Sequence, residues 1–310
     1  MATDIINGNL SISNDISDCS IMRGKAKTCI TKPVINQIEK TTGISASTPC
    51  ELVEKAAENL GCKVEDKVGK EKCVLKKLSE SGKIDPEIVR KELKNNYKIS
   101  GPTNTDLLSN IEIDKFMRQI AHFYPKFFAC PFAMVDFVNY GHFLSKMSIE
   151  QLYPRYDTFG CVINSDLHTG GGKHWMALYI DMRGREWTVE FFNSSGNRPV
   201  MEWQDWQIRI KNEMEKLIPK VKAAVQPQTA NIVNVTKIKH QKSRTECGLY
   251  SLYYILCRTM GIKWDKFTNI KVPDSEMMKF RQHLFVQSGR KKIKKFNFDE
   301  YKNNTDIKWE

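Results

Sequence analysis

The stretch from Cys247 to Met260 (CGLYSLYYILCRTM) constrains the fold more than any other part of this sequence. It is strongly apolar along its length and stops at Gly261, a residue typical of a helix C-terminus. A polar, basic run from 237 to 246 precedes it, so we expect the helix to begin at Cys247. No window approaches eighteen consecutive apolar residues, which predicts a buried core helix and no membrane span.

Further apolar segments in the second half of the chain predict a sheet. The expected strands are 158–164 (TFGCVIN), 174–181 (HWMALYID), 186–192 (EWTVEFF) and 231–238 (NIVNVTKI). Apolar residues at helical spacing predict further helices over 109–123 and 202–217. The order of helix, sheet and helix favours an α+β core over a regular βαβ winding.

Changes in composition divide the chain into four predicted segments. Residues 1–45 are rich in Ser, Thr, Asn and Lys, which predicts little stable structure. Residues 46–100 show helix-start patterns and predict a small helical module, and Gly101-Pro102 is its expected boundary. Residues 101–288 form the predicted core, and 289–310 form a basic tail.

The bulk composition limits the class of protein. The nine cysteines are odd in number and irregularly spaced, and no CxxC pair occurs, so we expect free thiols in a reducing, intracellular setting. The net charge of +12 favours contact with polyanions or acidic partners, although a solvated basic surface explains it as well.

The position of Cys247 gives it a chemical alternative to a structural role. Free cysteines are usually buried and inert, and Cys257, inside the apolar helix, fits that description. Cys247, in contrast, stands where the helix begins, and a helix N-terminus lowers a thiol pKa. The unpaired amides there can also stabilise an oxyanion. Gly248 allows a substrate to approach closely, because it carries no side chain.

A base, an orienting residue and an oxyanion donor are all available. His174 opens a predicted strand, whereas His168 and His240 lie in polar sequence with nothing evident to orient them. Asn193 ends the EWTVEFF strand, and a hairpin would bring it to the same end of the sheet as His174. Gln241, six residues before Cys247, can donate to an oxyanion.

The set His174-Trp175, Asn193 before two serines, and Gln241 with Cys247-Gly248 resembles the SUMO-protease and adenain-like clan of cysteine proteases. The similarity covers about 101–288 and is greatest to polyprotein-processing proteases of large cytoplasmic DNA viruses, of the African swine fever virus and poxvirus type. The resemblance implies a permuted papain-like core, with a central mixed sheet flanked by helices, and a mechanism that needs no cofactor.

The chain departs from the family pattern at three positions. Asn193 replaces the Asp of most SUMO proteases, as in the swine-fever-like branch, and Glu246 stands where the cellular enzymes usually have Asp. The segment 105–111 resembles the family's tryptophan-leucine-asparagine-aspartate segment, with Leu107 in place of the tryptophan. The resemblance therefore assigns substrate contact to Trp175 and Leu107, and implies a narrow tunnel for Gly-Gly.

The resemblance implies an endopeptidase that cuts viral core or capsid polyproteins after Gly-Gly during virion maturation, in the host cytoplasm and the virion core. Removal of a ubiquitin-like modifier is the alternative within the enzyme class. A non-enzymatic, nucleic-acid-associated core protein is the alternative outside it. The tail offers phosphate contacts for that alternative through Arg290, Lys291, Lys292, Lys294 and Lys295.

Overall fold

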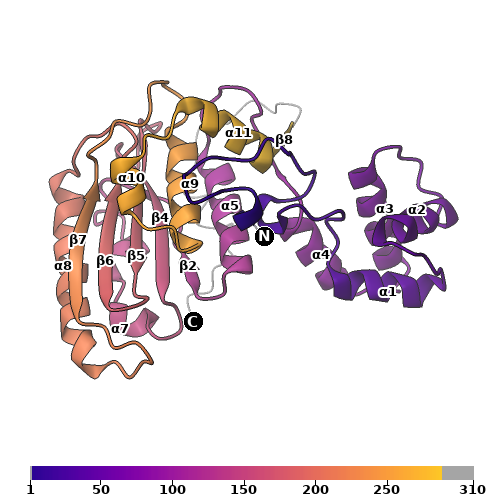
Figure 1. Ribbon diagram of the computed structural model, residues 1–310, viewed down its shortest axis with the longest axis horizontal. Helices are drawn as coiled ribbons and strands as arrows, with labels where there is room; N and C mark the ends of the chain where they lie inside the picture. Colours follow the sequence, from indigo (N-terminus) through magenta and orange to yellow (C-terminus); the bar gives the residue numbers. More distant parts are fainter. Residues whose placement is uncertain (1, 288–310) are drawn as a thin grey trace.

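The computed structural model describes residues 2–287 and arranges them in two unequal parts (Figure 1). The larger part is a sheet with helices on both faces, and the smaller part is a lobe of helices from the first hundred residues, on the right in Figure 1. Among residues 2–287, no helix is both long and apolar enough to cross a membrane. The basic run from Arg290 to Lys295 lies outside the described residues.

The central sheet is mixed, as the resemblance implied. Its strands are β2 (Phe127–Ala129), β3 (Ala133–Met134), β4 (Thr158–Asn164), β5 (Trp175–Asp181), β6 (Glu186–Phe192) and β7 (Thr229–Val235). They run in the order β2-β4-β5-β6-β7, and β3 pairs with β4. The pairs β4–β5 and β5–β6 are antiparallel, whereas β2–β4, β3–β4 and β6–β7 are parallel.

The middle of the sheet is buried on both faces, which is why its strands are nearly continuous apolar runs. Val162 and Tyr179 pack on one face with α9 (Cys247–Thr259) and α5 (Asn110–Phe123). Cys161 and Leu178 pack on the other face with α8 (Met201–Leu217). The strands and helices predicted for this core are present within a few residues of their expected bounds.

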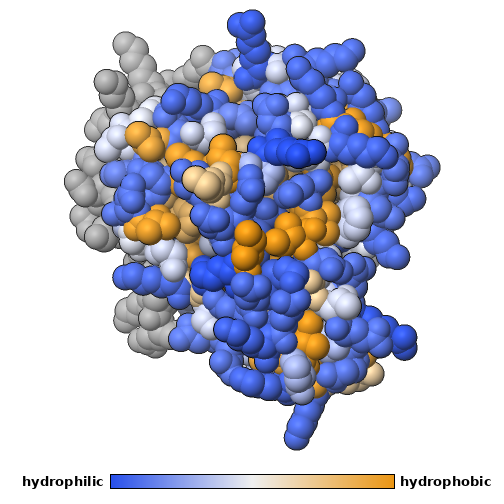
Figure 2. All heavy atoms as spheres, turned by 90° about the vertical axis from the view of Figure 1, so that its left-hand side faces the viewer, coloured by the Kyte–Doolittle hydropathy of each residue, from blue (hydrophilic) through white to orange (hydrophobic). Residues whose placement is uncertain are grey.

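Short elements complete the core. They are α6 (Phe143–Lys146), α7 (Ile149–Leu152), α10 (Asp265–Asn269), α11 (Asp274–Leu284), a 3₁₀ turn at Ile218–Lys220, and the pair β1 (Ile99–Gly101) and β8 (Phe285–Gln287). Figure 2 shows the α8 and β7 side of the molecule, where apolar residues are grouped among hydrophilic ones. The exposed apolar side chains of α8 and its N-cap are Val200, Met201 and Ile208.

Helix α9 is fixed to the sheet by a buried ion pair. Arg258, near its C-terminal end, donates to both carboxylate oxygens of Glu190 on β6, from Nε at 2.8 Å and from Nη2 at 2.7 Å. Nη2 also reaches Asp181 of β5 at 3.0 Å, and the Tyr254 hydroxyl donates to Glu190 at 2.6 Å. Because Glu190 is fully buried, these bonds offset the cost of removing its charge from water.

The smaller lobe consists of α1 (Lys32–Thr42), α2 (Pro49–Asn59), α3 (Lys67–Glu80) and α4 (Pro86–Asn95), which share one apolar cluster. We call this lobe the arm. Thr48 caps α2 and Asp85 caps α4, each followed by a proline at the first helical position, as the sequence indicates. Helices α1 and α3 were not predicted.

The prediction of little stable structure for residues 1–45 is wrong. Ile5, Ile6 and Leu10 are buried in the core cluster that contains α9, and the Ile12 amide donates to Glu276 of α11 at 2.6 Å. The chain then runs through a 3₁₀ turn at Ile21–Arg23 into α1. A few apolar residues spread through a polar segment are enough to anchor it, and average composition does not reveal them.

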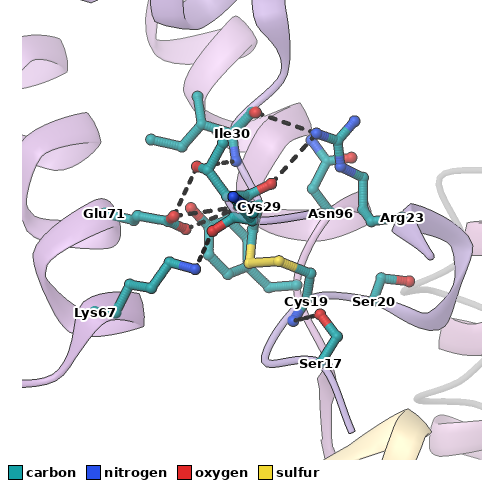
Figure 3. Close-up of a disulfide and its surroundings, with 12 residues drawn as sticks. Ser17, Cys19, Ser20, Arg23, Cys29, Ile30, Lys67, Glu71 and Asn96 are labelled. Atoms are coloured by element: carbon teal, nitrogen blue, oxygen red, sulfur yellow. Dashed lines mark hydrogen bonds between the residues drawn. A yellow bond between two sulfur atoms is a disulfide. The ribbon is translucent and has the colours of Figure 1, made fainter. Parts of the chain in front are cut away.

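The expectation of free thiols is also wrong for four of the nine cysteines. Cys19 pairs with Cys29 and Cys62 with Cys73, with Cα–Cα distances of 5.1 and 6.1 Å. Figure 3 shows the first disulfide at the joint between arm and core, beside buried Glu71, which accepts from the Cys29 amide. The pairing depends on how loops and helices meet in the arm, which the sequence spacing does not reveal.

The ion pair that fixes α9 generates a stability prediction. Replacing Arg258 with Ala leaves Glu190 buried without its counter-charge, so we expect a loss of about 3–5 kcal/mol in the free energy of unfolding. Urea denaturation measures it. Replacing Arg185, in the exposed turn between β5 and β6, with Ala is the control and should change stability by less than about 0.5 kcal/mol. Equal effects of the two changes would contradict the role given to Arg258.

Candidate active site

The β5–β6 hairpin brings His174 and Asn193 together. His174 immediately precedes β5 and Asn193 immediately follows β6, and the two strands are antiparallel, so these residues lie at the same end of the sheet. His174 Nε2 and Asn193 Oδ1 are 2.8 Å apart. The contact predicted from the hairpin is therefore present.

The bonds around Asn193 determine which ring nitrogen of His174 carries the proton. Asn193 Nδ2 donates to the Asn197 carbonyl at 3.1 Å, which can only accept, so Oδ1 must be the atom facing His174. The amide and hydroxyl of Ser195 also donate to Oδ1, at 3.0 and 2.8 Å. His174 therefore donates from Nε2, and in the neutral ring Nδ1 keeps a lone pair that can accept a proton.

Cys247 is the first residue of α9 and is only 2% exposed. Burial raises the pKa of its thiol above the ordinary value, while the backbone N–H groups of Trp175, Gly248 and Cys247 itself oppose this. The adjacent Glu246 carboxylate adds to the increase in pKa. A higher pKa favours the protonated thiol, so a nucleophilic role for Cys247 would require a base. The thiol accepts from the backbone N–H of Trp175, the residue directly after His174.

Gln241 is buried in the loop between β7 and α9. Its Nε2 donates to the Ser243 carbonyl at 3.0 Å, and its Oε1 accepts from the Ser194 hydroxyl at 2.8 Å. An amide nitrogen has two hydrogens, so one N–H remains for another acceptor.

Trp175 and Leu108 close over Gly248. The Trp175 indole donates to the Leu108 carbonyl at 3.1 Å. A Cβ on Gly248 would lie 3.2 Å from Leu108 Cβ and 3.3 Å from Trp175 Cδ1, so it would press on both side chains. Leu107, to which the resemblance assigned substrate contact, is 52% exposed, whereas its neighbour Leu108 is buried against Trp175.

Glu246 belongs to a buried ion pair. Its Oε1 lies 3.8 Å from Nη2 of Arg281, which is fully buried on α11, and it accepts from the Thr245 hydroxyl at 2.8 Å. Arg281 Nη1 donates to the Pro102 carbonyl at 3.1 Å. Glu246 therefore places a negative charge directly before Cys247, and Arg281 is its buried partner.

The two rival histidines have defined partners. His240 is buried, accepts from the Val272 amide at Nδ1 and donates to the Phe267 carbonyl from Nε2, and burial lowers its pKa to about 4. It is therefore a neutral structural residue. His168 contradicts the expectation that nothing orients it, because Asp136 Oδ2 lies 2.6 Å from its Nδ1.

Sequence reasoning missed two serines of the site. Asn193-Ser194-Ser195-Gly196 has the composition of a turn, and that interpretation hides the bonds from Ser194 to Gln241 and from Ser195 to Asn193. The available signal was their place directly after Asn193 in the set that carries the resemblance.

A cavity of about 900 Å³ lies away from these residues, between α4, α5 and β2, and Lys94, Arg118 and Arg155 contribute to its lining. None of the four candidate residues lines it. Among residues 2–287, no group of three or more His, Cys, Asp or Glu side chains is placed to hold a metal ion.

Comparisons with known proteins agree on one family. Residues 162–293 match the C-terminal catalytic domain of the Ulp1 protease family. A cysteine protease of African swine fever virus, Badajoz strain, is 35% identical over 88% of this chain and 97% of its own length. The SUMO-1 cysteine protease of a Kenyan isolate of that virus is 37% identical over 74% of this chain and 84% of its own length. The crystal structure of an African swine fever virus protease is 32% identical, covers 88% of this chain and 96% of its own, and has a TM-score of 0.65.

The charge of Glu246 generates a prediction about thiol reactivity. Burial is the main cause of the raised Cys247 pKa, and the Glu246 charge adds to it, so replacing Glu246 with Gln removes that added increase. We expect the pH profile of Cys247 alkylation by iodoacetamide, followed by peptide mass spectrometry, to move to lower pH. Replacing the exposed Glu202 of α8 with Gln is the control and should leave the profile unchanged. A shift to higher pH would contradict the electrostatic account.

Proposed function

The chain belongs to the Ulp1 protease family of cysteine proteases, together with its relatives from African swine fever virus, and we propose that it processes viral core or capsid polyproteins after Gly-Gly in Gly-Gly-Xaa sites. The observation that carries the proposal is the hydrogen bond of His174 to Asn193 beside a cysteine at a helix N-terminus. The relatives' cysteine protease activity and the similarity along almost their whole length support it.

The mechanism is acyl transfer. His174 Nδ1 takes the proton of the Cys247 thiol as the sulfur attacks the carbonyl carbon before the scissile bond. Asn193 accepts from Nε2–H and holds the ring without adding a charge. The oxyanion is bound by the Cys247 amide and the free N–H of Gln241, each worth roughly 3 kcal/mol in comparable sites.

The tetrahedral intermediate then collapses. The C–N bond breaks, and His174 gives its proton to the leaving amine, so the first product departs with a free amino group. Water attacks the thioester, His174 accepts one water proton, and the sulfur leaves with the return of that proton. The thiol and the neutral imidazole are restored, and the second product is a carboxylic acid that releases its proton to solvent.

Gly-Gly specificity is supported by the packing over Gly248. Trp175 and Leu108 approach this residue so closely that a single Cβ there would press on both. We propose that these two side chains narrow the substrate path beside Cys247, in line with the tunnel that the resemblance implies, so that glycine fits next to the reacting carbonyl. Leu107, exposed next to Leu108, is proposed to contact the substrate further from the bond that is cut.

Two alternatives lead to different substrates or partners. The name SUMO-1 cysteine protease, carried by some of the relatives, favours removal of a SUMO-type modifier as the second candidate. The basic run from Arg290 to Lys295 is the basis for nucleic-acid contact, with phosphates as the target. We place polyprotein processing in the host cytoplasm and the virion core by analogy with viral assembly proteases.

Substitution of the nucleophile tests the proposal. Cys247→Ala should abolish cleavage of a peptide library built around Gly-Gly-Xaa, read by mass spectrometry, because the attacking atom is lost. The matched control is Cys257→Ala, since Cys257 is also a buried free thiol of α9 and burial raises its pKa. This variant should keep full kcat/KM.

The same assay separates the candidates. Cleavage of viral polyprotein segments in preference to a SUMO precursor supports the proposal, and the reverse preference favours modifier removal. Undiminished cleavage by Cys247→Ala would show that the assignment of the nucleophile is wrong.

A further inference from the structure

Ser194 is held against Gln241 by two hydrogen bonds. The Ser194 hydroxyl donates to the side-chain oxygen Oε1 of Gln241 at 2.8 Å, and the Ser194 backbone carbonyl accepts from the Gln241 backbone N–H at 3.0 Å. Both side chains are buried, with exposed fractions of 1% for Ser194 and 6% for Gln241. The two residues come from loops 47 positions apart, so this contact joins the turn after β6 to the loop before α9.

The two ends of the Gln241 amide are distinguished by their partners. The Ser243 carbonyl can only accept, so the nitrogen end must lie there. The Ser194 hydroxyl then donates to the oxygen end. A rotation of the amide by half a turn would set Oε1 against the Ser243 carbonyl, two acceptors without a proton between them. The contacts therefore permit a single orientation of the amide.

This orientation matters because only the nitrogen end of an amide stabilises an oxyanion. A rotated amide would present Oε1 to a developing negative charge, which is repulsive. We propose that Ser194 is a positioning residue for catalysis, which holds the Gln241 amide so that its free N–H is directed at the oxyanion. The inference rests on the proposed function of Gln241 as an oxyanion donor.

The same turn also serves the base. Asn193 bonds His174, Ser195 bonds Asn193, and Ser194 between them bonds Gln241. Three consecutive residues thus fix the group that takes the thiol proton and the group that receives the negative charge. The distance between His174 and the Gln241 side chain is therefore held by one short stretch of backbone, because the partners of both residues lie in it.

The first test is Ser194→Ala measured on a Gly-Gly-Xaa peptide. The account expects kcat to fall about tenfold with KM unchanged, less than the roughly 100-fold loss that follows removal of an oxyanion donor itself. Affinity for a peptide aldehyde, which adds the Cys247 thiol to form an oxyanion-like adduct, should fall by the same factor. A change confined to KM, or an unchanged kcat, would overturn the proposal.

Ser20→Ala is the matched control. Ser20 is as buried as Ser194, and its hydroxyl donates to Gln119 Oε1 at 3.0 Å, so the same type of bond is lost away from the candidate site. We expect a similar loss of thermal stability in both variants and an unchanged kcat in Ser20→Ala. Equal loss of kcat in the two variants would show that the Ser194 effect is only structural.

A double variant separates the proposed oxyanion role of Gln241 from the proposed positioning role of Ser194. In a Gln241→Ala background, Ser194→Ala should cause no further loss of kcat, because the group that it positions is absent. Full kcat in Gln241→Ala alone would refute the oxyanion role on which the inference depends. A reduced kcat in Gln241→Ala, followed by the same Ser194→Ala factor in both backgrounds, would preserve that role and refute the positioning role of Ser194.

Discussion

The ion pair between Arg258 and Glu190 is the interaction on which the geometry of the site depends. The proposed nucleophile starts α9, whereas the proposed base and its orienting residue flank β5 and β6, so the candidate site exists only if helix and hairpin keep a fixed relation. Arg258 joins α9 to both strands through Glu190 and Asp181. The helix between Arg258 and Cys247 is buried at every position, so this anchor fixes the position of the thiol along the sheet.

Around the Cys247 thiol, the orientation of two side-chain amides is set by backbone carbonyls, which can only accept hydrogen bonds. The Asn197 carbonyl fixes the Asn193 amide, and the Ser243 carbonyl together with the Ser194 hydroxyl fixes the side-chain amide of Gln241. The Ser195 and Ser194 hydroxyls, which can donate or accept, then donate to the oxygen ends of the Asn193 and Gln241 amides, respectively. The polar side chains are therefore preorganised before substrate arrives, which is the condition under which hydrogen bonds stabilise a transition state most effectively.

Much of the core could be predicted from the sequence because its patterns are local. Polar or turn residues mark the ends of the apolar run that starts at Cys247 and of the strand before Asn193. The hairpin could be predicted because two strands joined by a short turn pair antiparallel. The packing of the first thirty residues on the core could not be predicted, because it depends on a few apolar side chains, such as Ile5, that join the cluster of α9 and α11. The disulfides, the packing of Leu108 against Trp175 and the bond of Ser194 to Gln241 likewise depend on distant segments meeting.

The central claim is that Cys247, activated by His174, attacks the carbonyl of the second glycine in a Gly-Gly site. The most direct measurement uses a peptide that ends in Gly-Gly with a vinyl sulfone in place of the scissile amide, and maps the adduct by tandem mass spectrometry. The account predicts one adduct, on Cys247, that forms much more slowly in His174→Ala. An adduct on Cys50, Cys130, Cys161 or Cys257 instead, or a rate that does not depend on His174, would contradict it.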